Sequence, residues 1–196
     1  MAVLKVHVTS LQPLLMHSPA GINPMNPLTK EMKSITSKRK KTDEDHLRIL
    51  EISYEMALYY NEDMQCPYIP STCVEGMLRN AAKKIRRGTD VISSITVTPC
   101  NIPLEYDGVK KKAELMAAFA VGKFCDIRNG RNPSTGSGIT LCRPRFDKWA
   151  LTFEIDYDES TFNEDEIKAL LIVGGNKIGL CDYRPKYGTF GFKVAK

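Results

Sequence analysis

The sequence predicts an α+β fold whose elements follow the order strand, helix, two strands, helix, strand. Residues 2–11 and 149–157 alternate apolar and polar side chains with a period of two, which is typical of half-buried strands. Between residues 42 and 60, 72 and 88, and 163 and 173, apolar residues instead recur every three to four positions, as in amphipathic helices. The order matches a ferredoxin-like or RRM-like βαββαβ core, with insertions after the first strand and before the strand at 149–157.

The first strand leads into a long insertion. Leu4, Val6 and Val8 share one face of the strand, which we expect to be buried. Residues 12–41 then contain four prolines, which exclude a regular helix or a central strand. We therefore predict a basic, proline-containing loop here, within a single domain that spans residues 1–196. A loop of this length is uncommon in a compact domain and usually has a function.

The first helix has a clear start. Thr42 is a good N-cap, and Asp43, Glu44 and Asp45 follow in the first turn, where the helix dipole favours negative charge. The helix should run to about Tyr60. Its buried stripe is expected to consist of Leu47, Leu50, Tyr54, Ala57 and Leu58.

The second helix is predicted from a capping box. Thr72 and Glu75 have the spacing at which each side chain caps the other's backbone, and Gly88 is a natural end. The residues expected to face inward are Met77, Leu78, Ala81 and Ile85.

A second insertion, residues 89–147, separates this helix from the strand at Trp149. Residues 91–106 favour strands. Residues 113–118 favour a helix and residues 120–127 allow a strand. We expect the insertion as a whole to contain a hairpin. Residues 129–138 are rich in glycine and polar residues, which predicts a flexible loop.

The C-terminal part should hold one more helix and one more strand. Asn163 and Glu166 form a second capping box, and Gly174-Gly175 should end the helix. Its inward side is expected to contain Ile167, Leu170, Leu171 and Val173. Residues 189–194 favour the final strand.

The charge distribution points to a polyanionic partner. The formal net charge is only +5, but the cations gather in short runs, at 38–41, 83–87, 110–112, 143–145 and 184–186. Residues 154–166, in contrast, contain no Lys or Arg. Clustered cations are typical of nucleic-acid-binding surfaces, although any one run can also be a solvated face. We predict phosphate contacts by Lys38, Arg39, Lys40, Lys41, Arg79, Lys83, Lys84, Arg184 and Lys186.

The cysteine pattern and hydropathy exclude several classes of protein. Six cysteines occur, none at the spacing of a zinc site, and a chain of this length needs no disulfide framework. No apolar run approaches the roughly 18 residues of a membrane span. We therefore expect an intracellular, cytoplasmic protein with reduced thiols, no metal, no cofactor and no membrane partner.

The C-terminal segment is rich in glycine. Gly179, Gly188 and Gly191 allow the backbone to approach a phosphate, whose oxygens successive N–H groups can bind. Tyr183 and Tyr187 lie between them and are candidates for stacking on bases. The alternative is that the glycines only permit a tight turn onto the last strand.

Two segments resemble motifs of the repeat-associated mysterious protein (RAMP) superfamily, which supplies the CRISPR effector subunits that line guide RNA. Residues 178–190, IGLCDYRPKYGTF, resemble its glycine-rich C-terminal loop, and residues 69–82, IPSTCVEGMLRNAA, resemble its strand-to-helix motif. In the second motif Ser71 replaces the usual glycine and Glu75 the usual lysine. The chain as a whole resembles small RAMP-like proteins encoded by bacteriophages and prophages.

The resemblance implies a modified RNA-recognition fold that binds single-stranded RNA or DNA, as a homo-oligomer or filament. Residues 30–41 would then contact nucleic acid or the next subunit. One alternative is an interaction module that mimics or interferes with a CRISPR effector subunit, with residues 154–166 as its binding surface. The other is a RAMP-like nuclease in which His46, Asp43 and Asp45 act as acid, base or ion ligands.

Overall fold

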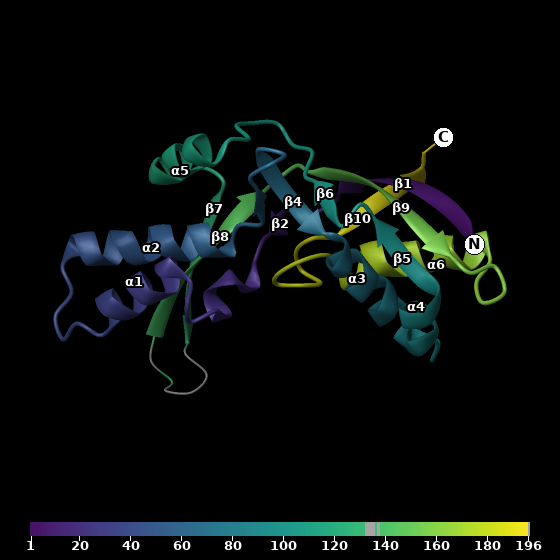
Figure 1. Ribbon diagram of the computed structural model, residues 1–196, viewed down its shortest axis with the longest axis horizontal. Coiled ribbons are helices and arrows are strands. Elements are labelled where there is room, and N and C mark those ends of the chain that lie inside the picture. The colour runs from purple at the N-terminus through teal and green to yellow at the C-terminus, as the bar shows by residue number, and fades with distance from the viewer. Residues whose placement is uncertain (132–135, 137, 196) are drawn as a thin grey trace. The chain divides into compact units, whose positions relative to one another are not determined.

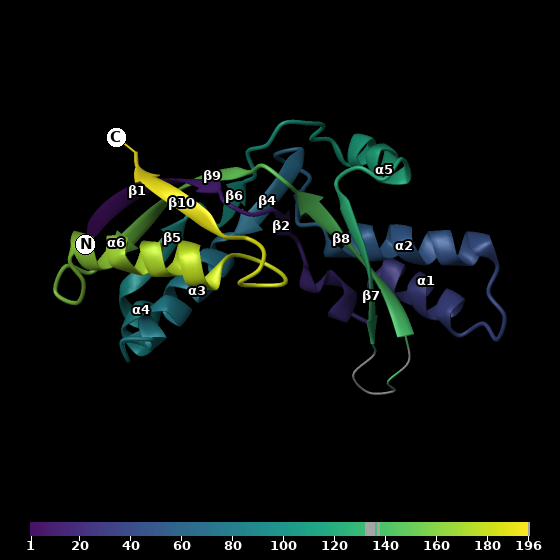
Figure 2. The same cartoon turned by 180° about the vertical axis from the view of Figure 1, so that it is seen from behind.

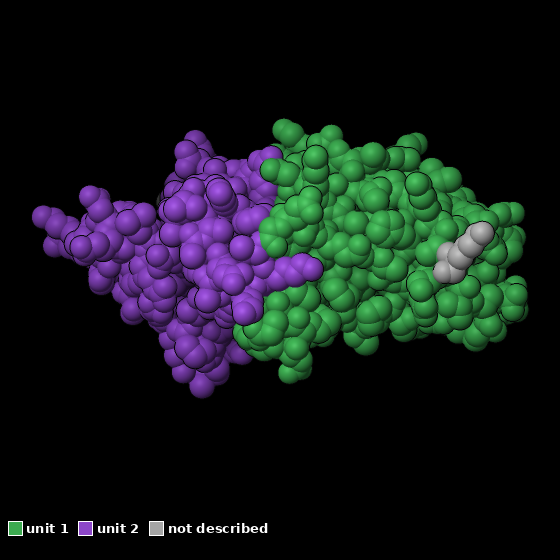
Figure 3. All heavy atoms as spheres, turned by 90° about the horizontal axis from the view of Figure 1, so that it is seen from above, with its two compact units in different colours: residues 1–14, 60–108, 146–196 green, residues 15–59, 109–145 purple. Residues whose placement is uncertain are grey.

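The computed structural model describes residues 1–131, 136 and 138–195. Two compact units share the chain (Figure 3). Unit 1 comprises residues 1–14, 60–108 and 146–196, and unit 2 comprises residues 15–59 and 109–145. Unit 1 is thus assembled from three separate stretches of the sequence.

The main sheet of unit 1 has four strands. They are β1 (Ala2–Ser10), β5 (Ile95–Thr98), β9 (Ala150–Tyr157) and β10 (Phe190–Val194), in the spatial order β10-β1-β9-β5. Every neighbouring pair is antiparallel. The strands predicted at both ends of the chain and at Trp149 are therefore confirmed.

The alternation of side chains gives this sheet one apolar face. Leu4, Val6 and Val8 are buried as predicted, and Val6 lies opposite Phe153 on β9. Two helices, α3 (Ser71–Lys83) and α6 (Glu164–Val173), cover this face (Figure 1). Their apolar sides and the sheet form the core of unit 1.

The opposite face of the sheet is polar. Lys5, His7 and Thr9 project from β1, and Thr152 and Glu154 project beside them from β9. The aromatic residues of these four strands, all described, lie on the covered face, because Phe192 is aligned with Val8 and Phe153 with Val6. The exposed face therefore lacks the stacking aromatics with which an RNA-recognition sheet binds bases.

Smaller elements complete unit 1. A second sheet contains β3 (Tyr60–Asn61), β4 (Cys66–Pro70) and β6 (Asn101–Pro103). A short helix, α4 (Gly88–Ser94), follows α3, and a π-helical turn (Gly174–Ile178) follows α6.

Two predictions about the helix expected at residues 72–88 are wrong. Gly88 does not end a helix before a strand; it starts α4, and the predicted strand begins only at Ile95. Ile85, predicted to face inward, is 58 % exposed because α3 ends at Lys83. The capping box at Asn163 and the end of α6 at Gly174 are confirmed, and a π-helical turn, Gly174–Ile178, follows directly.

Unit 2 is built mainly of helices and a hairpin. The helices are α1 (Pro27–Thr36), α2 (Asp43–Ala57), α5 (Lys112–Ala120) and the 3-10 turn Pro19–Ile22. The strands β7 (Cys125–Arg131) and β8 (Gly138–Phe146) pair antiparallel, and β2 (Leu14–Leu15) adjoins β8.

The prediction that residues 12–41 form a loop without helix is wrong. Pro27 occupies the first position of α1, where its missing N–H is not needed, so the proline starts the helix rather than breaking it. The side chain of Asn26 caps it by accepting from Leu28 N at 2.9 Å. Helix α2 begins with the predicted Thr42 cap, but Leu47 is 63 % exposed rather than buried.

The second insertion agrees with the sequence only in part. The predicted helix at 113–118 is confirmed within α5, and the possible strand at 120–127 begins at Cys125 as β7. Part of the predicted loop at 129–138 lies outside the described residues, and its first residues continue β7 to Arg131. Strand β8 was not predicted, because arginine and proline interrupt its apolar pattern.

Membrane spans and disulfides were not expected from the sequence. Across the described part of the chain, each helix is too short or too polar to traverse a lipid bilayer. All six cysteines are free thiols.

Candidate nucleic-acid interface

Helix α3 carries exposed cations on the side that faces away from the core. Val74, Met77 and Leu78 are buried, so the helix presents Arg79 and Lys83 to solvent one turn apart. Lys84 and Arg86 follow directly and are also exposed. Within the described residues, none of these four cations forms an ion pair. They are therefore available to an external anion.

Arg87, the last cation of the same run, has a structural role instead. Its guanidinium bonds Asp90 at 2.8 Å and Glu166 at 2.6 Å, and it lies 4.1 Å from the centre of the Phe162 ring. The pKa of Arg87 is raised, chiefly by its hydrogen bond to Asp90. The charge run at 83–87 thus divides into solvent-facing cations and one that connects α4 to the start of α6.

Other basic runs are also partly neutralised. Lys112 pairs with Glu55 at 3.0 Å, and Arg145 pairs with Asp126 at 3.3 Å. In unit 2, Lys38 pairs with Asp45 at 2.6 Å, while Arg39 and Lys40 are exposed. Lys41 donates to the carbonyl of Lys38 at 3.1 Å. Counting cations along the sequence therefore overstates the charge that an outside ligand meets.

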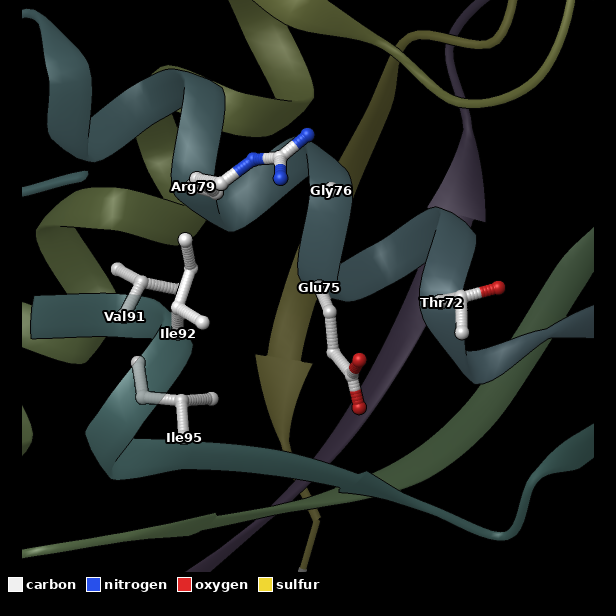
Figure 4. A pocket seen from close by; sticks show the side chains of 7 residues that line it. All are labelled: Thr72, Glu75, Gly76, Arg79, Val91, Ile92 and Ile95. Atoms are coloured by element: carbon white, nitrogen blue, oxygen red, sulfur yellow. The ribbon is translucent and has the colours of Figure 1, made fainter. Parts of the chain in front are cut away.

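Two adjoining hollows lie beside the cations of α3. The first, of about 370 Å³, is lined by Thr72, Glu75, Gly76, Arg79, Val91, Ile92 and Ile95 (Figure 4). The second, of about 390 Å³, is lined by Arg79, Lys83, Arg86, Gly88, Thr89 and Ile92. Because they share Arg79 and Ile92, they form one groove, which we call the α3–α4 groove.

Glu75 does not have the capping role that the sequence predicts. The N-cap of α3 is Pro70, whose apolar ring cannot accept a hydrogen bond from the helix, so the predicted box with Thr72 is wrong. Instead, Glu75 Oε1 accepts a hydrogen bond from Val97 N at 3.0 Å. The carboxylate thereby connects α3 to the edge strand β5 and lies in the groove.

Gly179 and Gly188 close the base of the C-terminal loop. Gly188 has a φ of 72°, and a Cβ there would lie 2.1 Å from the carbonyl oxygen of Leu180. Its N–H donates to Pro13 O, and that of Gly179 donates to Gly174 O, both at 2.8 Å. These two N–H groups are therefore used inside the protein and are not free to bind a phosphate. Gly191 lies in β10, with open space around it.

The loop presents side chains at its tip. Tyr183, Arg184 and Lys186 are exposed, and the Tyr183 ring lies edge-on to that of Tyr187 at 6.4 Å. The Cys181 thiol contacts Cys73 in the first turn of α3, and this contact together with burial raises the pKa of Cys181. The loop and α3 accordingly run beside each other (Figures 1 and 2). Both segments belong to unit 1.

The three catalytic candidates are not gathered into a site. Both oxygens of Asp45 are occupied, because Oδ1 bonds Lys38 and Oδ2 accepts from Thr42 N at 3.1 Å. Hydrogen bonding to Lys38 is the main cause of the lowered pKa of Asp45. The side chains of His46 and Asp43 are exposed and have no polar partner among the described residues. Nor do the described residues contain a His, Cys, Asp and Glu cluster of metal-binding size.

Sequence reasoning missed the groove, chiefly because it assigned α4 to a strand. Ile92 fell within the residues 91–106 predicted to favour strands, whereas it lies in α4 and is 66 % exposed at the shared wall of both hollows. A signal was present: Thr89 and Asp90 after Gly88 favour a helix start.

One of the comparisons with known proteins finds a match, and this match concerns the fold alone. No family model and no curated protein sequence matches the chain. Its structure is similar to a chain in a solved structure described as a cryo-EM structure of the Type III-B Cmr-beta bound to cognate target RNA, with a TM-score of 0.55 and 10 % sequence identity. The match covers 99 % of this chain and 58 % of that chain. The likeness supports the mixed α+β fold that the sequence predicts.

Proposed function

We propose that unit 1 binds single-stranded nucleic acid through the phosphates of its backbone. The observation that carries the proposal is a set of unpaired cations beside an open groove, Arg79 and Lys83 on α3 and Lys84 and Arg86 directly after it. Unpaired cations on a rigid helix bind phosphates and release counterions, which favours association without reading the sequence.

The C-terminal loop supplies the second part of the binding surface. Arg184 and Lys186 add exposed cations to unit 1, and Tyr183, which is 38 % exposed, offers a ring to an unpaired base. Stacking needs bases that are free of a duplex, so the combination favours a single strand. Arg39 and Lys40 of unit 2 are a further proposed phosphate contact.

The fold supports RNA as the preferred ligand. The structural neighbour is a chain of a complex bound to target RNA, and the order β10-β1-β9-β5 with α3 and α6 on one face supports a ferredoxin-like assignment of unit 1. The exposed sheet face lacks aromatics, so we place the nucleic acid on α3 and the loop rather than on the sheet. The same neighbour supports, as a proposal, association with CRISPR effector proteins.

Fluorescence anisotropy with labelled single-stranded RNA and DNA tests the proposal. The decisive variant combines Arg79→Gln, Lys83→Gln and Arg86→Gln. Each lost phosphate contact lowers the slope of log affinity against log salt by about 0.7, so we expect the slope to fall by about 2. The matched control removes the same charge from exposed lysines elsewhere in unit 1, with Lys5→Gln, Lys148→Gln and Lys193→Gln. Equal losses in both variants, or no binding by folded wild-type protein at low salt, would reject the proposal.

A further inference from the structure

The position of Glu75 is unexpected on a surface that binds phosphates. It lies four residues before Arg79 on α3, the spacing and order at which a glutamate and an arginine normally pair. The structure has no such pair. The carboxylate extends toward β5, where Val97 N donates to Oε1, and the guanidinium of Arg79 extends in another direction (Figure 4).

This separation leaves two different groups available in one groove. Arg79 stays free for a phosphate, and within the described residues Oε2 of Glu75 has no partner. A carboxylate can only accept hydrogen bonds, and it repels phosphate. A ligand of the groove must therefore offer an N–H donor to Glu75, while the negative charge of the ligand lies near the cations.

The apolar wall of the groove has the character of a base-binding surface. Val91, Ile92 and Ile95 lie opposite Glu75 (Figure 4), and Ile92 remains 66 % exposed. Pockets for unstacked bases combine apolar side chains against the ring with polar groups at its edge. The volume of about 370 Å³ is at the lower end of the range of small-ligand sites.

We propose that the α3–α4 groove binds one base of a single strand and that Glu75 selects a base with an exocyclic amino group (cytosine, adenine or guanine) over uracil. The proposal rests on the proposed function. The amino group would donate to Oε2 of Glu75, while the neighbouring hollow with Arg79, Lys83 and Arg86 would hold the phosphates. Uracil has the size of cytosine but presents a carbonyl oxygen where cytosine has its amino group, so it would face the carboxylate with an acceptor.

Oligocytidine and oligouridine of equal length are the matched probes, because they differ only in the groups at the base edge. We expect wild-type protein to bind oligocytidine about tenfold more tightly than oligouridine in anisotropy titrations. Glu75→Gln keeps an oxygen for Val97 N and adds an amide that can donate to uracil, so the preference should disappear or reverse. The salt dependence of binding should stay unchanged, because phosphate contacts are untouched.

Ile92→Ala provides a second variant, one that leaves the fold intact because the side chain is mostly exposed. It should weaken binding of both oligonucleotides by a similar factor. Equal wild-type affinity for the two, or a preference that Glu75→Gln leaves unchanged, overturns the inference while the proposed function stands. Absence of binding to either oligonucleotide rejects both.

Discussion

The ammonium group of Lys38 lies 2.6 Å from Oδ1 of Asp45, and Oδ2 of the same carboxylate accepts from Thr42 N. One cation of the run at 38–41 is therefore held at the start of α2. Arg39 and Lys40, between α1 and α2, remain exposed. The two kinds of cation should differ in what they contribute.

We expect Lys38→Gln to lower the free energy of unfolding, because it removes the ion pair at the start of α2. A variant with both Arg39→Gln and Lys40→Gln should leave stability unchanged and weaken binding of single-stranded RNA. Urea unfolding and anisotropy measure the two effects. If Lys38→Gln affects only binding, the ion pair does not stabilise α2.

Acid should destabilise the protein through carboxylates that are ionised in the fold. Hydrogen bonding to Arg128, aided by Arg145, lowers the pKa of Asp126. A carboxyl whose folded pKa lies below its unfolded value of about 3.9 stabilises the protein above that pH, and this contribution is lost as the pH falls through the folded pKa. The denaturant concentration at the unfolding midpoint should therefore decrease as the pH is lowered below about 4. In Asp126→Asn this decrease should be smaller. An unchanged acid profile in Asp126→Asn would contradict the assignment.

Gly188 and Gly191 make a matched pair. Gly188→Ala places a Cβ 2.1 Å from Leu180 O at a positive φ, so we expect a loss of more than about 2 kcal/mol in unfolding free energy. Gly191→Ala has open space around it and should change stability by less than about 0.5 kcal/mol. Thermal unfolding followed by circular dichroism compares the two. Similar stabilities would mean that the loop base does not need glycine.

Arg86 and Arg87 are neighbours with opposite roles. Arg87→Gln removes the bonds to Asp90 and Glu166, so the melting temperature should fall by several degrees. Arg86→Gln should leave the melting temperature unchanged and weaken RNA binding. Loss of binding in a folded Arg87→Gln protein, with none in Arg86→Gln, would reverse these roles.

The contributions of Tyr183 and Arg184 to binding should differ in their dependence on salt concentration. Replacing a stacked aromatic costs about 1–3 kcal/mol per base, so Tyr183→Ala should weaken binding roughly 5- to 150-fold at every salt concentration. Arg184→Gln should instead reduce the salt slope by about 0.7. Anisotropy at several salt concentrations distinguishes them, and a Tyr183→Ala effect that vanishes at high salt would argue against stacking.

The sequence predicted the regular parts of the core and missed elements that depend on tertiary contacts. Period-two alternation located β1 and β9, and the capping residues Thr42 and Asn163 located α2 and α6, because these signals are local. Helix α4 has only seven residues, and its pattern of apolar residues is equally compatible with a strand. Pro27 looked like a helix breaker, since its position within a future helix is not visible from composition.

The sequence predicted which residues belong to the candidate site but not how these residues are arranged. Clustering identified Arg79, Lys83 and Arg184, which are exposed in unit 1. It could not show that Lys38 is paired, because the partner Asp45 lies in the following helix. It also assigned Glu75 to a cap, since the hydrogen bond to Val97 joins residues that the sequence places far apart.

The pairing of β1 with β9 and β10 has a consequence for synthesis on the ribosome. Thr9 pairs with Ala150 and with Gly191, so the first strand is made long before either neighbour exists. At about 5–20 residues per second, Val6 and Val8 wait on the order of ten seconds for a partner. Lys5 and His7, which alternate with them, keep the nascent strand polar on one side and so reduce its tendency to aggregate during that interval.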